Sequence, residues 1–117
     1  MSFVLGIDTS NYTTSCALLD TADMRVRSCK KLLPVKQGER GLRQSDAVFH
    51  HTKQLPELMK QLFDKKYDIS AVGYSYAPRC AEGSYMPCFL VGENVAQAVS
   101  LACGDDLEKT SHQVGHI

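Results

Sequence analysis

The sequence predicts an α/β fold in which a mixed sheet opens with an antiparallel meander and is flanked by helices. Three short runs rich in β-forming residues come first, and a fourth lies between two stretches with helical periodicity. The chain has 117 residues, of which 44% are hydrophobic and 22% are charged. These values are typical of one globular domain with a single core.

The leading meander rests on three runs of residues. Phe3–Ile7 is an apolar run that ends at Asp8 and predicts a buried strand. Ser15–Leu19 is a second apolar run, and the turn-forming, hydroxyl-rich residues between the two runs favour a hairpin. Met24–Leu33 supplies the third strand, which Pro34 ends.

The first helix follows a glycine-containing loop at 36–42. Apolar residues then recur at helical spacing between Val48 and Phe63. Ser45 or Asp46 is expected to cap the start of this helix. Pro56 lies inside the pattern and predicts either a kink or a new helix start.

The second half of the chain alternates strand and helix. A fourth strand is expected over Ile69–Tyr76, followed by an irregular stretch at 77–87. Phe89–Cys103 has helical periodicity and is so rich in apolar and small residues that it is expected to lie buried against the sheet. Gly104 is the expected C-cap, and the polar tail from Thr110 is assigned no element.

Charge and targeting signals limit the classes of partner. Lys and Arg together number 13, as do Asp and Glu, so the chain has no basic excess for DNA, and RNA contact would need a local patch or a partner chain. No signal peptide and no membrane-spanning run are recognisable, which predicts a cytoplasmic protein without a membrane partner. The wide spacing of the cysteines, without a CxxC pair, predicts reduced thiols at Cys16, Cys29, Cys80, Cys88 and Cys103.

A candidate phosphate site follows the first strand. Asp8 comes directly after it, and the next residues include the hydroxyl side chains of Thr9, Ser10 and Thr13. Backbone N–H groups and hydroxyls of such a turn can donate to phosphate oxygens, while the carboxylate can hold Mg²⁺ through water. The alternative is a plain β-turn with an Asx cap.

A candidate metal site lies near the end of the sequence. His112 and His116 stand four residues apart, so on a helix both imidazoles would lie on one face and could ligate one metal ion. Gln113 occupies the position of the general-base glutamate of HExxH metallopeptidases, which disfavours that mechanism. The alternative is a pair of surface histidines.

Further candidates lie after the fourth strand and in the first helix. Arg79 could pair with a phosphate or carboxylate, and Glu82 with a cation or a base, although loop charges are more often solvated. Of His50 and His51, one is expected to pack or hydrogen-bond at the face of the sheet rather than to act as a ligand.

These segments resemble the TsaD/glycoprotease family in order over nearly the whole chain. LGIDTSNYTTSCALLD resembles its LGIETS opening, and QSDAVFHHTKQLPELMKQL resembles its first long helix, with His50 and Pro56 at matching positions. ISAVGYSYAPR resembles the strand that leads to a GPG loop, and FLVGENVAQAVSLA resembles the helix after it. HQVGH resembles the HxxGH metal motif and is the most specific element.

The resemblance implies a ribonuclease-H-like lobe of the actin-like ATPase superfold, with 1–117 as a single N-terminal lobe and the second lobe absent. It implies ATP or threonylcarbamoyl-AMP near Asp8, Thr9, Ser10 and Thr13, and iron or zinc on His112 and His116. Its implied activity is threonylcarbamoyl transfer to a tRNA adenosine, in which the metal polarises carbamoyl or phosphate oxygens and a TsaB-like protein is the partner.

Two departures from the family leave alternatives open. Asp8 replaces a glutamate, and Ala77-Pro78-Arg79 replaces the GPG loop, as expected of a divergent paralogue. We expect the isolated lobe to be inactive and to self-associate as a dimer, through a sheet edge or the 89–103 helix. The alternatives are a non-catalytic TsaB-like interaction module, a metalloendopeptidase, and a sugar or acyl kinase of the same superfold.

Overall fold

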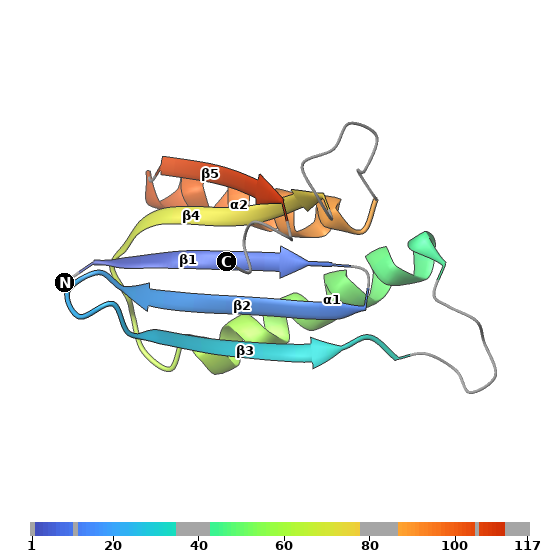
Figure 1. Ribbon diagram of the computed structural model, residues 1–117, viewed down its shortest axis with the longest axis horizontal. Helices are drawn as coiled ribbons and strands as arrows, with labels where there is room; N and C mark the ends of the chain where they lie inside the picture. The colour runs from blue at the N-terminus through green and yellow to red at the C-terminus, as the bar shows by residue number, and fades with distance from the viewer. Residues whose placement is uncertain (1, 11, 35–42, 78–86, 105, 112–117) are drawn as a thin grey trace.

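The structure, a computed structural model, describes residues 2–10, 12–34, 43–77, 87–104 and 106–111. In these residues a five-stranded sheet has the order β3-β2-β1-β4-β5. Helices α1 and α2 both lie on one face of the sheet, α1 against β2 and β3 and α2 against β4 and β1 (Figure 1). The predicted mixed sheet flanked by helices is confirmed.

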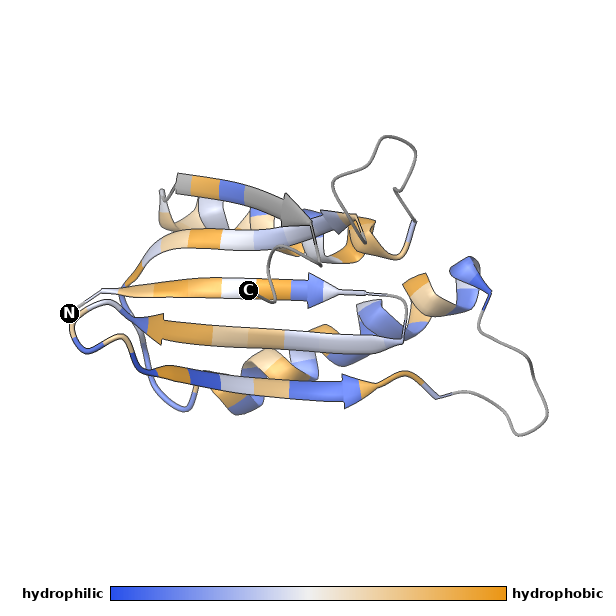
Figure 2. Ribbon diagram, in the orientation of Figure 1, coloured by the Kyte–Doolittle hydropathy of each residue, from blue (hydrophilic) through white to orange (hydrophobic). Residues whose placement is uncertain are grey.

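The leading antiparallel meander is also confirmed. It consists of β1 (Phe3–Thr9), β2 (Thr13–Asp20) and β3 (Val26–Leu32). Burial alternates along β1 and β2, so their apolar side chains meet the helices and the intervening ones point to the opposite face. Figure 2 shows apolar residues along β1 and in the second half of β2.

Two more strands extend the sheet beyond β1. β4 (Ile69–Ala77) pairs parallel with β1, and β5 (Asp106–Ser111) pairs parallel with β4. The sequence prediction missed β5. Its residues, DLEKTS, contain one large apolar side chain, Leu107, so no period-two pattern marks the strand, and its conformation depends on pairing with β4.

Helix α1 (Gln44–Leu62) runs without interruption through Pro56. The expected caps at Ser45 and Asp46 are wrong, because the N-cap is Arg43 and makes no side-chain capping bond. Pro56 lacks the amide that would bond the Thr52 carbonyl, but both residues are exposed, so water can bond that carbonyl instead.

Helix α2 (Phe89–Cys103) ends as predicted. Gly104 adopts the left-handed conformation, with φ 70° and ψ 28°, and its N–H donates to the Ser100 carbonyl. Phe89, Val91 and Ala96 are buried. The prediction that this helix packs against the sheet is therefore confirmed.

The core has two parts. The larger part fills the space between the sheet and the two helices. A smaller cluster joins the end of the meander to the starts of both helices, and consists of Leu33, Ala47, Cys88 and Phe89. It therefore braces the end of the sheet where β1 and β4 finish.

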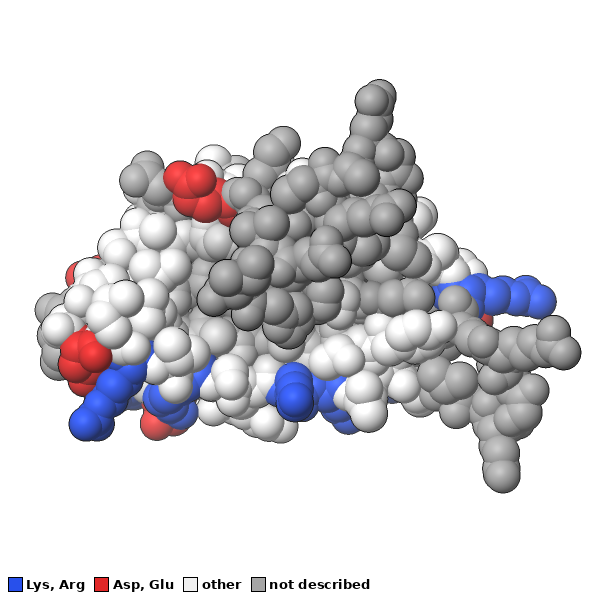
Figure 3. Space-filling model, viewed as in Figure 1, with Lys and Arg blue, Asp and Glu red and all other residues white. Residues whose placement is uncertain are grey.

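Basic side chains gather on one side of the surface, although the chain as a whole has no net charge. In Figure 3 basic side chains are seen along the β3 side of the molecule, and β3 carries Arg27, Lys30 and Lys31. Lysines on an edge strand discourage pairing with another chain.

Among the described cysteines, Cys16, Cys29, Cys88 and Cys103 are free thiols, as predicted. Neither helix of the described part combines the length and apolar character that a membrane span requires.

Candidate phosphate-binding edge of the sheet

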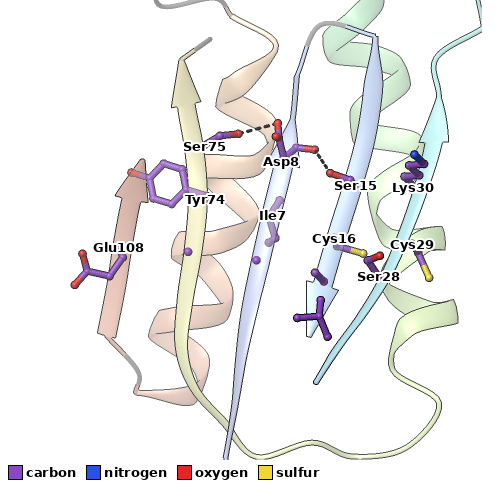
Figure 4. A pocket seen from close by; sticks show the side chains of 14 residues that line it. Ile7, Asp8, Ser15, Cys16, Ser28, Cys29, Lys30, Tyr74, Ser75 and Glu108 are labelled. Carbon is purple, nitrogen blue, oxygen red and sulfur yellow. Dashed lines mark hydrogen bonds between the residues drawn. The ribbon is translucent and has the colours of Figure 1, made fainter. Parts of the chain in front are cut away.

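The C-terminal ends of β1 and β4 meet at one edge of the sheet, because these strands are parallel neighbours. In α/β proteins this edge is where ligand-binding groups are placed. Asp8 on β1 and Ser75 on β4 face each other there, and Ser75 Oγ donates to Asp8 Oδ1 at 2.8 Å (Figure 4). The fold thus holds one carboxylate oxygen in place directly before the hydroxyl-rich turn.

Asp8 belongs to a polar row that crosses the face of the sheet opposite the helices. Ser15 is its partner on β2, and Lys30 is the partner of Ser15 on β3. Beside this row the residues are small, so the face is hollowed into a cavity of about 570 Å³ (Figure 4). The lining that gives this hollow its depth is Gly6, Ala17, Ser28 and Gly73.

Thr9 points to the other face, toward α2. Its side chain is fully buried, and Oγ1 donates to the Cys88 carbonyl at 2.9 Å while accepting the Gly92 N–H at 3.0 Å. Both bonds lie within the fold. The hydroxyl that the sequence placed at a phosphate therefore anchors the first turn of α2 to the end of β1.

Ser10 and Thr13 lie in and beside the turn that joins β1 to β2. Ser10 Oγ donates to the Thr13 carbonyl at 3.3 Å, and both residues are half-buried. The Leu33 N–H donates to the Tyr12 carbonyl at 2.8 Å, which ties the turn to the end of β3. The turn is thus held from both sides, with Ser10 next to Asp8.

A buried polar network lies beneath this turn. His51 on α1 is fully buried, with Nδ1 2.7 Å from Thr14 Oγ1, and the Thr14 hydroxyl donates to Gln54 Oε1 at 3.1 Å. Burial lowers the pKa of His51 below its ordinary value. The expectation that one of the two histidines packs against the sheet is confirmed for His51, whereas His50 is half-buried beside Phe49.

Several predicted site residues lie outside the described residues: His112, His116, Arg79, Glu82 and Cys80. Their predicted roles stay predictions. Within the described residues, no group of three or more His, Cys, Asp or Glu side chains gathers as a metal site would require.

Sequence reasoning missed Ser75, Gln54 and Gly92. Ser75 could have been found, because it lies near the end of the predicted 69–76 strand, where parallel strands carry ligand-binding groups. Gln54 and Gly92 act through contacts between distant parts of the chain, so no local pattern marks them.

The sheet order and the helix arrangement define the chain as one lobe of the actin-like ATPase superfold. YeaZ from Pseudomonas aeruginosa shares this fold, with a TM-score of 0.64 and 21% identity over 95% of this chain and 44% of YeaZ. No family model matches the sequence.

Curated proteins are similar to this chain in sequence as well. The tRNA N6-adenosine threonylcarbamoyltransferase of Campylobacter curvus is 29% identical over 116 residues, which cover 97% of this chain and 33% of the relative. A probable bifunctional tRNA threonylcarbamoyladenosine biosynthesis protein of Thermoplasma acidophilum is 27% identical over 118 residues, covering 97% of this chain and 21% of the relative. The chain spans about a third or less of these relatives and is similar to them over nearly its whole length.

Proposed function

We propose that this lobe binds the phosphate side of a nucleotide in a TsaD-like protein that transfers a threonylcarbamoyl group from threonylcarbamoyl-AMP to a tRNA adenosine. One observation carries the proposal: Asp8 is fixed by Ser75 at the edge where β1 and β4 end, directly before the turn. The names of the curated relatives favour transfer to tRNA over peptide cleavage.

Each residue of the edge then has a distinct role. A carboxylate without a metal ion would repel phosphate. Asp8 therefore holds, through water, the Mg²⁺ ion that accompanies ATP. Ser10, Thr13 and the backbone N–H groups of the turn donate to phosphate oxygens. Thr9 contributes indirectly, because its bonds to α2 fix the end of β1.

The metal part of the proposal rests on His112 and His116. Imidazole nitrogens are ligands that both iron and zinc accept, but two of them do not complete a site. The remaining ligands would come from a second lobe. When bound, the metal would polarise the carbamoyl or phosphate oxygens. A TsaB-like protein and tRNA would be the partners, in the cytoplasm.

We expect the 117-residue chain to bind ATP with Mg²⁺ weakly and to transfer no threonylcarbamoyl group, because one lobe forms only one wall of the cleft. Calorimetry with ATP and an assay with threonylcarbamoyl-AMP, tRNA and a TsaB-like protein test both points. Absence of ATP binding would contradict the phosphate site. Turnover near that of a full-length relative would contradict the need for a second lobe.

A second candidate function is pairing with another lobe. The exposed face of α2 carries no charged side chain and includes Leu90, Asn94, Gln97, Ala98 and Leu101. Leu101 is 84% exposed. Glu93, the only charged residue of α2, lies off this face and accepts a hydrogen bond from Tyr74 at 3.3 Å. An uncharged helix face of this kind is typical of helix–helix packing between two copies.

Replacing Leu101 by Glu should therefore weaken self-association. We expect the wild-type chain to sediment as a dimer at high concentration and Leu101→Glu as a monomer, because the new carboxylate would be buried in the contact. Met24→Glu is the matched control, since Met24 is 67% exposed and lies away from α2. A wild-type monomer, or equal dimerisation of all three chains, would argue against pairing through α2.

A further inference from the structure

His51 occupies a position that no part of the proposed function yet uses. It lies on α1 beneath the turn between β1 and β2, and none of its surface is exposed. Its Nδ1 meets Thr14 Oγ1, Thr14 donates to Gln54 Oε1, and Gln54 Nε2 donates to the Leu32 carbonyl at 3.4 Å. The network therefore ties α1 to β2, and through the Leu32 carbonyl to β3, directly under the candidate phosphate site.

These bonds assign the protons of the imidazole. Thr14 has one hydroxyl proton, which it gives to Gln54, so Nδ1 must carry the proton that it shares with Thr14. Nε2 then carries a lone pair. Among the described residues it has no hydrogen-bond partner, although it is buried. Buried polar atoms without a partner are uncommon in folded proteins and require an explanation.

The surroundings of His51 act on its charge in both directions. Burial lowers its pKa, whereas the Ser10 backbone and the negative charge of Asp8 raise it, and His50 lowers it. Asp8 comes from β1 and His50 from α1, while β2 and β3 contribute only the Thr14 hydroxyl and the Leu32 carbonyl to the network. Burial thus disfavours the imidazolium form, and Nε2 is the atom that would take up the second proton.

We propose that His51 takes up a proton when an anion such as a phosphate group binds at the turn beside Ser10 and Thr13. This inference rests on the proposed phosphate site. A bound anion adds the negative charge that a buried imidazolium lacks. His51 is therefore a positioning residue. It supplies a positive charge beneath the turn when the ligand brings a negative one.

The direction of the pH effect follows from linkage. If the anion raises the pKa of His51, protonated His51 must bind the anion more tightly, and one unit of pKa corresponds to about tenfold in affinity. Well above the pKa of the anion-bound state the imidazole is neutral with or without the anion, and affinity is constant. As the pH falls through that pKa towards the lower pKa of the free state, affinity rises.

Sulfate is the probe, because it does not titrate in this range. Its affinity would be measured by calorimetry from about pH 8 to about pH 5 for wild type, His51→Asn and His50→Asn. An asparagine amide can donate to Thr14 in place of Nδ1 but cannot take up a proton. We expect affinity to rise by about tenfold in wild type and His50→Asn and to stay level in His51→Asn.

A second measurement needs no variant. The His51 ring is titrated by NMR in the wild-type chain with and without saturating sulfate, and its pKa should be higher with sulfate. An unchanged pKa, or the same rise of affinity in His51→Asn as in wild type, would overturn the coupling and leave the phosphate site standing. If sulfate and ATP both fail to bind wild type at any pH, the phosphate site itself fails.

Discussion

Replacing Gly92 by Val should lower the free energy of unfolding by about 3 kcal/mol, as measured by urea or thermal denaturation. A Cβ at this position would lie 3.0 Å from Thr9 Oγ1 and 3.2 Å from Ile7 Cγ2, both on β1. The branched side chain would push α2 off the sheet and break the bond from the Gly92 N–H to Thr9. Since small domains are stable by about 5–15 kcal/mol, this is a large share of the total.

The matched control for Gly92→Val is Ala98→Val. Ala98 lies on the exposed face of the same helix, so the control measures the intrinsic cost of valine in a helix, about 0.6 kcal/mol. If both variants lose the same stability, Gly92 is not required for the close approach of α2 to β1. Because Thr9 anchors this approach, the variant also tests the structural role of that hydroxyl.

Thr9 illustrates which part of the candidate site could be predicted from the sequence. Strand alternation puts Leu5, Ile7 and Thr9 on one face of β1 and Asp8 on the other, so the sequence alone could have separated Asp8 from Thr9. A hydroxyl-rich turn is typical of phosphate sites, and this pattern predicts Thr9 beside Asp8. The strand extends to Thr9, two residues beyond the predicted end at Ile7, and this extension carries the hydroxyl into the core.

Elements with their own hydrophobic period were predicted from sequence, and elements that depend on distant partners were not. β1, β2 and α2 have such patterns, whereas β5 forms beside β4 in spite of its polar residues. His51 and His50 are adjacent and identical in type, so only the packing of α1 on β2 decides which one is buried. The same holds for Ser75, whose role depends on the pairing of β4 with β1.

The charge of Asp8 should matter for nucleotide binding with opposite sign in the presence and absence of metal. Asp8→Asn keeps the shape of the side chain and an oxygen that can accept from Ser75, so the fold should persist. With Mg²⁺, we expect ATP affinity to fall by about tenfold or more, because the carboxylate that holds the ion is lost. Without metal, affinity should increase, because the repulsion between carboxylate and phosphate is removed.

Calorimetric titrations of ATP with Mg²⁺ and with a chelator, on wild type, Asp8→Asn and Asp46→Asn, separate this effect from net charge. Asp46 is an exposed carboxylate in the first turn of α1, and its replacement changes the net charge by the same amount. An equal loss in both variants would indicate a general electrostatic effect, and a loss in Asp8→Asn that persists in chelator would indicate damage to the turn. Only a reversal of sign at Asp8 supports a carboxylate that acts through a metal ion, because direct contact with phosphate cannot be favourable for an unprotonated carboxylate.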